Sequence, residues 1–251
     1  MITKFELDTL AEKYETSDFI KSDPVQFIHR YDFLQDVEIV AFLSSLFAFG
    51  SRKVFIKKLE ELFLLMGKSP YDFILNGDID IFSKFDYRFA KPEDVKNILL
   101  VLRKFYSSAN SLEDLFEYGY KQDNTIKSSM IAVSDYFYSN VKAFSSGFSF
   151  MIAQPRKGGA MKRMNMFLRW MIRKSSVDKG VWNFIMPSEL LIPLDVHVAN
   201  VSRKMGLLAR ASNDFKAVLE LTERLKEFDF EDPIKYDFAM FGAGVEGLYK
   251  D

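Results

Sequence analysis

Residues 154–174 have the sequence QPRKGGAMKRMNMFLRWMIRK, and this stretch decides how the rest of the chain is interpreted. A Pro, two basic residues and a Gly-Gly pair break the chain directly before an apolar-periodic segment, which predicts a helix from about Ala160 to Lys174. Glycines ahead of a helix let backbone N–H groups approach an anion, and the helix N-terminus adds positive potential. The stretch therefore suits a phosphodiester, although such a glycine pair is more often a simple turn.

The same stretch lies in a region without acidic residues. Residues 136–177 contain no Asp or Glu, while the whole chain has a net charge of -1. The eight basic residues of this region are Lys142, Arg156, Lys157, Lys162, Arg163, Arg169, Arg173 and Lys174. A positive stripe on an otherwise acidic molecule directs an anionic partner to one face. The alternative is a solvated basic helix face with no partner.

Outward from this stretch, the hydrophobic pattern is helical throughout, and no run alternates as a strand does. Helices are expected at about 37–49, 51–66, 70 onward, 92–105, 111–120, 125–140, 196–206, 214–227 and 233 onward, the last ending in a glycine-rich tail at 242–247. Asp36 and Asp232 are expected to cap two of them. The predicted fold is all-α, with two helical lobes that share a cleft and join near residue 140.

Composition excludes several classes of site. The 251 residues are 48% hydrophobic and 27% charged, as in a globular protein. No cysteine is present, which excludes disulfides, zinc-thiolate sites, a cysteine nucleophile and a thiolate-held iron–sulfur cluster. The only two histidines, His29 and His197, exclude a three-imidazole site and leave a metal-dependent phosphohydrolase poorly supported. We therefore expect no metal and no cofactor.

No membrane segment is expected either. The longest charge-free runs, 39–51 and 143–155, have thirteen residues each, which is too few for a helix to span a bilayer. The first ten residues carry three charges and lack the apolar core of a signal peptide. The expected location is the cytoplasm.

Two residues near helix N-termini could carry chemistry. Lys162 lies in the first turn of its expected helix, where the helix end and Arg163 both favour the neutral, nucleophilic amine; the alternative is a phosphate-contacting or solvated lysine. Asp195 follows Ile192-Pro193-Leu194 and precedes an apolar-periodic helix. It can act as an N-cap, or as a carboxylate that stabilises a cation or accepts a proton from a nearby amine.

These residues carry a resemblance to known proteins. IPLDVHVANVSRKMGLL (192–208) resembles the aspartate segment of the helix-hairpin-helix DNA glycosylases. KRMNMFLRWMIR (162–173), PLDVHV (193–198) and DPIKYDFAMFGAG (232–244) resemble an uncharacterised bacterial family related to that superfamily, nearest to its archaeal 8-oxoguanine glycosylases. The family resemblance covers almost the whole chain, and the resemblance to the glycosylases themselves covers about 155–245.

The resemblance implies roles for particular residues. Lys162 matches the catalytic lysine and Asp195, 33 positions later, the catalytic aspartate. Arg169, Asp237 and Phe241 match the residues that contact the flipped base. DNA contacts are implied at Arg156, Lys157, Gly158, Gly159, Arg163, Arg173, His197 and Arg203. The chain departs from the pattern in GGAMK for the hairpin signature, in Arg169 for a lysine and in Phe241 for a tryptophan, which leaves the excised base less defined than the fold.

The implied protein is a single glycosylase-like unit over 1–251. It would have a helical lobe at about 30–140 and a hairpin-containing lobe at 141–251, with the N-terminal segment packed on the second lobe. Its implied function is DNA base-excision repair as a DNA glycosylase and AP lyase, with DNA as the partner and 8-oxoguanine as the candidate lesion. The alternative is a non-catalytic nucleic-acid-binding protein that retains the same fold.

Overall fold

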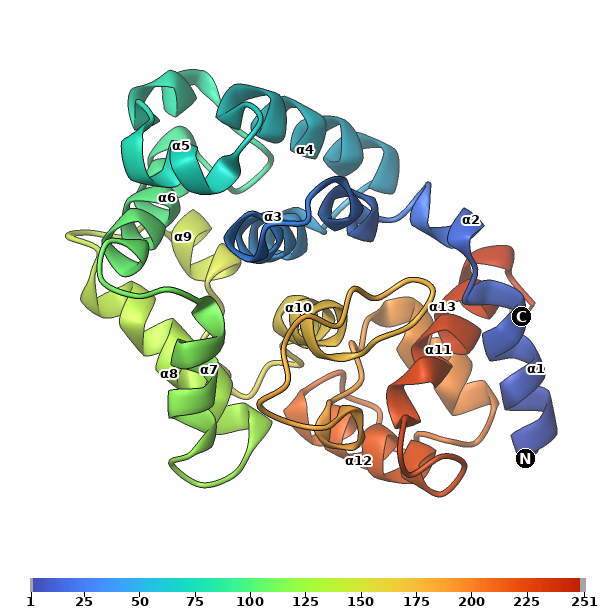
Figure 1. The fold of residues 1–251 in the computed structure, drawn as a ribbon. Coiled ribbons are helices and arrows are strands. Elements are labelled where there is room, and N and C mark those ends of the chain that lie inside the picture. Colours follow the sequence, from blue (N-terminus) through green and yellow to red (C-terminus); the bar gives the residue numbers. More distant parts are fainter. Residues whose placement is uncertain (1, 249–251) are drawn as a thin grey trace. The chain divides into compact units, whose positions relative to one another are not determined.

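The computed structural model describes residues 2–248, and its internal contacts divide the chain into two compact units. The continuous unit comprises residues 23–156, and the composite unit joins residues 2–22 to 157–248. Both units are helical, and the described residues form no β-strand, only three isolated β-bridges (Figure 1). The expected all-α class is confirmed.

The continuous unit follows the predicted helices closely. Its elements are η1 (Pro24–Arg30), α3 (Leu34–Phe47), α4 (Arg52–Met66), α5 (Pro70–Asn76), η2 (Ile79–Lys84), α6 (Pro92–Tyr106), α7 (Leu112–Tyr120), α8 (Ile126–Ser139) and α9 (Ser146–Met151). Helix α3 is buried along nearly its whole length. Its carboxylate Glu38 is fully buried and accepts hydrogen bonds from the Tyr106 hydroxyl, the Ser111 hydroxyl and the Leu112 backbone N–H. Neutral donors therefore line this acid in the core.

The predicted cap at Asp36 is wrong. Helix α3 begins two residues before Asp36, and Phe33 is its N-cap. The Asp36 carboxylate is buried and accepts hydrogen bonds from the Tyr71 N–H and the Ser69 hydroxyl at the start of α5. An acid in a first turn can satisfy the N-terminus of a neighbouring helix as well as its own, and the sequence pattern does not separate the two cases.

The composite unit contains the stretch 157–174. Its elements are α1 (Lys4–Tyr14), α2 (Ser17–Ile20), α10 (Lys162–Ile172), η4 (Pro187–Glu189), α11 (Val196–Lys204), α12 (Phe215–Lys226), η5 (Pro233–Lys235) and α13 (Tyr236–Glu246); η3 (Pro155–Lys157) lies at the junction with the continuous unit. Helices α1 and α11 both pack on α13, so the first and last helices of the chain lie side by side (Figure 1). Residues 141–156 belong to the continuous unit.

Helix α13 corrects the expected glycine-rich tail. Gly242 and Gly244 lie inside the helix, which continues to Glu246. A side chain at Gly242 would place its Cβ 2.3 Å from the Tyr14 ring, and one at Gly244 would lie 3.1 Å from the His197 Cβ. These glycines therefore let α1 and α11 approach α13 closely, rather than ending it.

Helix α10 turns a row of its basic side chains inward. Trp170 and Phe167 are fully buried, as expected for core residues, but Arg169 and Arg173 are also buried, at 3% and 5% exposure. The basic region therefore does not form one continuous exposed stripe, because two of its eight cations lie inside the composite unit. No helix within residues 2–248 is long and apolar enough to cross a bilayer.

Candidate functional site

Lys162 and Asp195 are brought together by the composite unit. The Lys162 Nζ lies 3.1 Å from the Asp195 Oδ2, although 33 positions separate them in the sequence. Both side chains keep access to solvent, with 31% and 15% exposure. The other Asp195 oxygen, Oδ1, accepts a hydrogen bond of 2.9 Å from the Val198 N–H and caps α11. One carboxylate thus serves as the helix cap and as the partner of the lysine.

Two helix N-termini meet at this pair. Lys162 is the first residue of α10, and Asp195 is the N-cap of α11. The N-cap of α10 is Met161, which has a left-handed backbone (φ 52°) and provides no side-chain hydrogen bond. Such a conformation is unfavourable for a non-glycine residue and is concentrated at functional sites. The helix N-terminus of α10, which receives no side-chain hydrogen bond from its N-cap, and the adjacent lysine make this corner attractive to an anion.

Asn165 links the two segments that carry the pair. Its side chain is 1% exposed, and its Nδ2 donates to the Ala160 carbonyl before α10 and to the Ile192 carbonyl before α11, at 3.2 and 3.4 Å. Its Oδ1 is buried without a hydrogen-bond partner. This amide therefore holds the backbone ahead of Lys162 against the backbone ahead of Asp195.

Arg169 and Asp237 form a buried ion pair in the same unit as Lys162 and Asp195. Arg169 Nη1 donates to Asp237 Oδ2, and the guanidinium carbon lies 4.4 Å from the centre of the Phe238 ring. Burial raises the pKa of Asp237 to about 7. Arg169 and Lys162 oppose this rise, whereas Asp195 reinforces it, so the Asp237 carboxyl responds to the Lys162–Asp195 pair.

Phe241 lies one helical turn after Asp237, as its spacing predicts. Its ring makes edge contacts with the rings of Phe19 and His197, with centroid distances of 6.1 and 6.2 Å. His197 is exposed on the first turn of α11, two residues after Asp195. Phe241 is therefore held between α2 and α11, next to the N-terminus of α11.

The Gly158-Gly159 turn is anchored to a second helix start. Gly158 has φ 77°, a conformation that favours glycine, and its carbonyl accepts a 2.8 Å hydrogen bond from the Phe215 N–H. Gly159 forms an isolated β-bridge with Asp214, the N-cap of α12. No atom lies within 4 Å of a Cβ built at either glycine, so their outer face is open.

The other expected DNA contacts differ in exposure. Arg156 and Lys157 are exposed, and Arg156 pairs with Asp135 inside the continuous unit. Burial lowers the pKa of Arg163 to about 10, which still leaves it charged at neutral pH. Arg203 is partly buried and donates to the Arg210 and Ala211 carbonyls and to the Asn213 side chain.

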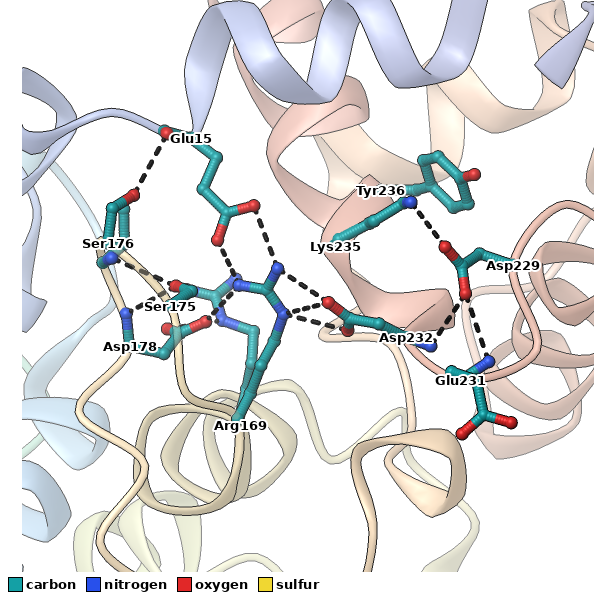
Figure 2. A network of polar contacts seen from close by, with 12 residues as sticks. Glu15, Arg169, Ser175, Ser176, Asp178, Asp229, Glu231, Asp232, Lys235 and Tyr236 are labelled. Carbon is teal, nitrogen blue, oxygen red and sulfur yellow. Dashed lines mark hydrogen bonds and ion pairs between the residues drawn. The ribbon is translucent and has the colours of Figure 1, made fainter. Parts of the chain in front are cut away.

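Arg173 lies inside a network of acids. Its guanidinium donates to Glu15, to Asp232 and to the fully buried Asp178, which also accepts a 3.1 Å hydrogen bond from the Arg169 Nε (Figure 2). Asp232 is the N-cap of η5 with Pro233 directly after it, as predicted, but its side chain makes no capping hydrogen bond and pairs with Arg173. The position of Arg173 suits a structural ion pair and not a phosphate contact.

A cavity of about 510 Å³ in the composite unit is lined by Asp8, Ala11, Glu12, Glu15, Arg173, Ser175, Ser176 and Lys235. It opens beside the network of Figure 2, and its lining includes none of the Lys162, Asp195 and Asp237 side chains. Within residues 2–248, no three His, Cys, Asp or Glu side chains are grouped to hold a metal ion.

Sequence reasoning missed two residues of this region. Asn165 is a polar residue on the buried face of α10, three positions after Lys162, and that spacing was its signal. Asp178 is the first acid after the acid-free region 136–177, which makes it the nearest acid in sequence to the arginines of α10. The sequence positions of Asn165 and Asp178 indicate only that these residues lie in or shortly after α10, and not which groups they contact.

The site thus belongs to an all-α protein with a lysine–aspartate pair at two helix N-termini. The chain belongs to the family described as a protein of unknown function (DUF2400), whose model matches residues 23–246. No curated protein and no solved structure matches the chain.

Proposed function

We propose that this protein is a DNA glycosylase and AP lyase that excises a damaged base through a Schiff base on Lys162, with 8-oxoguanine as the candidate lesion. The observation that carries the proposal is the 3.1 Å contact between Lys162 Nζ and Asp195 Oδ2 at the meeting of two helix N-termini. The sequence resemblance to helix-hairpin-helix glycosylases names the same two residues as the catalytic pair.

The pair has the chemistry that base excision needs. Asp195 accepts one proton from the Lys162 ammonium and passes it to solvent, which leaves a neutral amine beside a regenerated carboxylate. The amine can attack the sugar C1′. The C1′–N bond to the base breaks as the C1′–Nζ bond forms, and the base leaves with the electron pair and a proton released by the amine. Opening of the sugar ring then gives the Schiff base. The Asp195 carboxylate stabilises the positive charge that develops at C1′.

A second set of side chains fits the role of a base pocket. Asp237 has a pKa of about 7 and can donate or accept a hydrogen bond near neutral pH. Phe241, one turn later on α13, offers a ring on which a base could stack, an interaction worth about 1–3 kcal/mol. In this proposal Arg169 positions Asp237 by their ion pair instead of contacting the base directly.

DNA phosphates would be held by groups that remain accessible. These are the Gly158-Gly159 turn, the uncapped N-terminus of α10, and the exposed side chains of Arg156, Lys157 and His197. Extruding a nucleotide from the stack costs a few kcal/mol, and less for a damaged base, which favours lesions as substrates.

Borohydride trapping tests the proposal. Wild type and Lys162→Gln are incubated with labelled duplexes that carry 8-oxoguanine, uracil, hypoxanthine or an abasic site. A covalent band with one lesion base, lost in the variant, supports the proposal. A band with abasic DNA alone does not, since many amines trap such sites. DNA binding without a band for any lesion favours the non-catalytic DNA-binding protein, in which Lys162 is a phosphate contact and Lys162→Arg retains binding.

A further inference from the structure

Asp178 is a buried carboxylate shared by two arginines. Its side chain has no solvent exposure. Oδ1 accepts a hydrogen bond of 3.1 Å from the Arg169 Nε, and Oδ2 accepts one of 3.0 Å from the Arg173 Nη1 (Figure 2). Removing charged groups from water is costly unless they are paired. Asp178, Arg169 and Arg173 therefore depend on one another.

The loop that carries Asp178 is fastened to the end of α10. The Ser175 hydroxyl accepts hydrogen bonds from the N–H groups of Val177 and Asp178, both 3.0 Å long. The Trp170 carbonyl accepts from the N–H groups of Lys179 and Gly180 at 3.1 Å. This backbone fixes the Asp178 carboxylate in place relative to the α10 side chains.

Asp178 and Asp237 compete for Arg169. The guanidinium uses Nε for Asp178 and Nη1 for Asp237, and it lies over the Phe238 ring, so its plane is fixed. Because one positive charge is divided between two carboxylates, neither carboxylate is fully neutralised by it.

The charges facing Asp237 come from three elements. Helix α10 contributes Arg169 and Lys162, the start of α11 contributes Asp195, and the loop after α10 contributes Asp178. Arg173, the other cation nearby, is engaged by Glu15 and Asp232 as well as by Asp178. Around Arg169 and Arg173, carboxylates therefore outnumber guanidinium groups.

We propose that Asp178 is a positioning residue that holds part of the Arg169 charge away from Asp237 and so favours the protonated form of the Asp237 carboxyl. This rests on the proposed function only where it concerns excision: if Asp237 contacts the base, then Asp178 sets the pH at which the base is bound. The raised pKa of Asp237 agrees with this arrangement.

The test is the titration of Asp237 in the protein without DNA, monitored by NMR of ¹³C-labelled aspartate carboxyls. The Asp237 signal is assigned by its loss in Asp237→Asn. In Asp178→Asn, Arg169 no longer shares its charge with a carboxylate at position 178, and we expect the midpoint of the Asp237 titration to fall by about one pH unit. Asp232→Asn is the matched control, because it removes a carboxylate that pairs with Arg173. In Asp232→Asn, the midpoint of the Asp237 titration should stay within a few tenths of a pH unit of the wild-type midpoint. An unchanged midpoint in Asp178→Asn, or an equal shift in Asp232→Asn, overturns the proposal.

A second variant covers a failure of Asp178→Asn to fold. Ser175→Ala keeps every charge but removes the hydroxyl that holds the Asp178 backbone, and it should lower the Asp237 midpoint by a smaller amount; no shift there would contradict the proposal. The pH profile of excision is then measured for wild type and for whichever variant folds. No excision in wild type, with the titration shift present, rejects the proposed function and leaves the role of Asp178 intact. Excision whose pH profile does not follow the titration rejects the link between Asp178 and base binding.

Discussion

Two helix starts in the composite unit have almost the same backbone but different partners. Asp195 caps α11 with φ -117° and ψ -173°, and Asp214 caps α12 with φ -118° and ψ -175°. Each carboxylate accepts from the N–H three residues later, Val198 or Ala217. The second partner of Asp214 is Arg210, four positions before it, whereas the second partner of Asp195 is Lys162 on another helix.

The second partner of each aspartate separates a structural cap from a candidate catalyst. Asp214 closes a local salt bridge, and the Arg210 guanidinium holds the pKa of its carboxyl well below the usual range. The Asp214 carboxylate therefore stays ionised and is unsuited to accept a proton. Asp195 is paired with a primary amine, a group that can lose a proton and attack carbon. Capping geometry alone does not distinguish the two aspartates; the distant partner does.

The largest effect is expected from Lys162→Gln. It should reduce borohydride trapping on lesion DNA to background, about a thousandfold or more, because an amide cannot form the Schiff base. Lys216→Gln is the matched control, since Lys216 is an exposed lysine in the first turn of α12. Trapping that survives in Lys162→Gln would place the nucleophile elsewhere, and loss of trapping in both variants would mean that the loss is not specific to Lys162.

The next effect compares the two caps directly. Asp195→Asn should slow single-turnover excision about a hundredfold to a thousandfold, because the charge that stabilises C1′ is lost. Asp214→Asn should leave excision within a few-fold of wild type. Both variants should keep nearly the stability of wild type, since Asn is itself a good N-cap. Equal loss of excision in the two variants would show that only helix capping matters.

Asp237 gives a pH-dependent effect on stability. Its folded-state pKa of about 7 lies above the ordinary value of 3.8, so the folded protein binds a proton that the unfolded chain lacks between these values, and the Asp237 contribution to stability is lost as pH rises from 3.8 through 7. Relative to wild type, Asp237→Asn should therefore gain up to about 1.4 kcal/mol per pH unit in that window. Urea unfolding at pH 5.5 and 7 measures this; a constant difference between the two proteins would argue against a raised pKa.

The smallest effect is expected at the turn that joins the two helix starts. Gly158→Ala should cost about 1 kcal/mol, because the φ of 77° is unfavourable for alanine and Gly158 binds the first residue of α12. Gly159→Ala should be nearly neutral for stability, since it lacks a positive φ and has open space at its Cβ. Thermal unfolding compares the two. Similar losses would mean that the turn is not held by its backbone conformation.

Most of the helices were predictable because periodicity and end signals agreed. Gly67 ends α4, Ser69-Pro70 begins α5, and Pro92 begins α6, as expected from their sequences. The short helices α2 and α9 were missed because six residues or fewer carry too little periodicity. The N-terminal helix α1 was also missed, although Thr3 and Glu6 form a capping box that could have revealed it.

The candidate pair was predictable, but its surroundings were not. Lys162, Asn165, Arg169 and Arg173 recur at spacings of three and four, so they lie along one side of α10. Sequence alone gives this row of polar residues a solvent-facing role, since buried charges are rare. The structure pairs its buried arginines with Asp178, which follows them closely in the sequence, and with Glu15, Asp232 and Asp237, which come from distant parts of the chain. Only the tertiary fold brings the three distant acids to the row.

The most direct test of the central claim is to locate the covalent bond. Wild-type protein is reacted with an 8-oxoguanine duplex in the presence of borohydride, digested, and analysed by mass spectrometry for the lysine that carries the reduced sugar adduct. We expect an adduct on Lys162 and a lower yield in Asp195→Asn than in Asp214→Asn. An adduct on another amine, or none with DNA bound, would show that Lys162 is not the nucleophile.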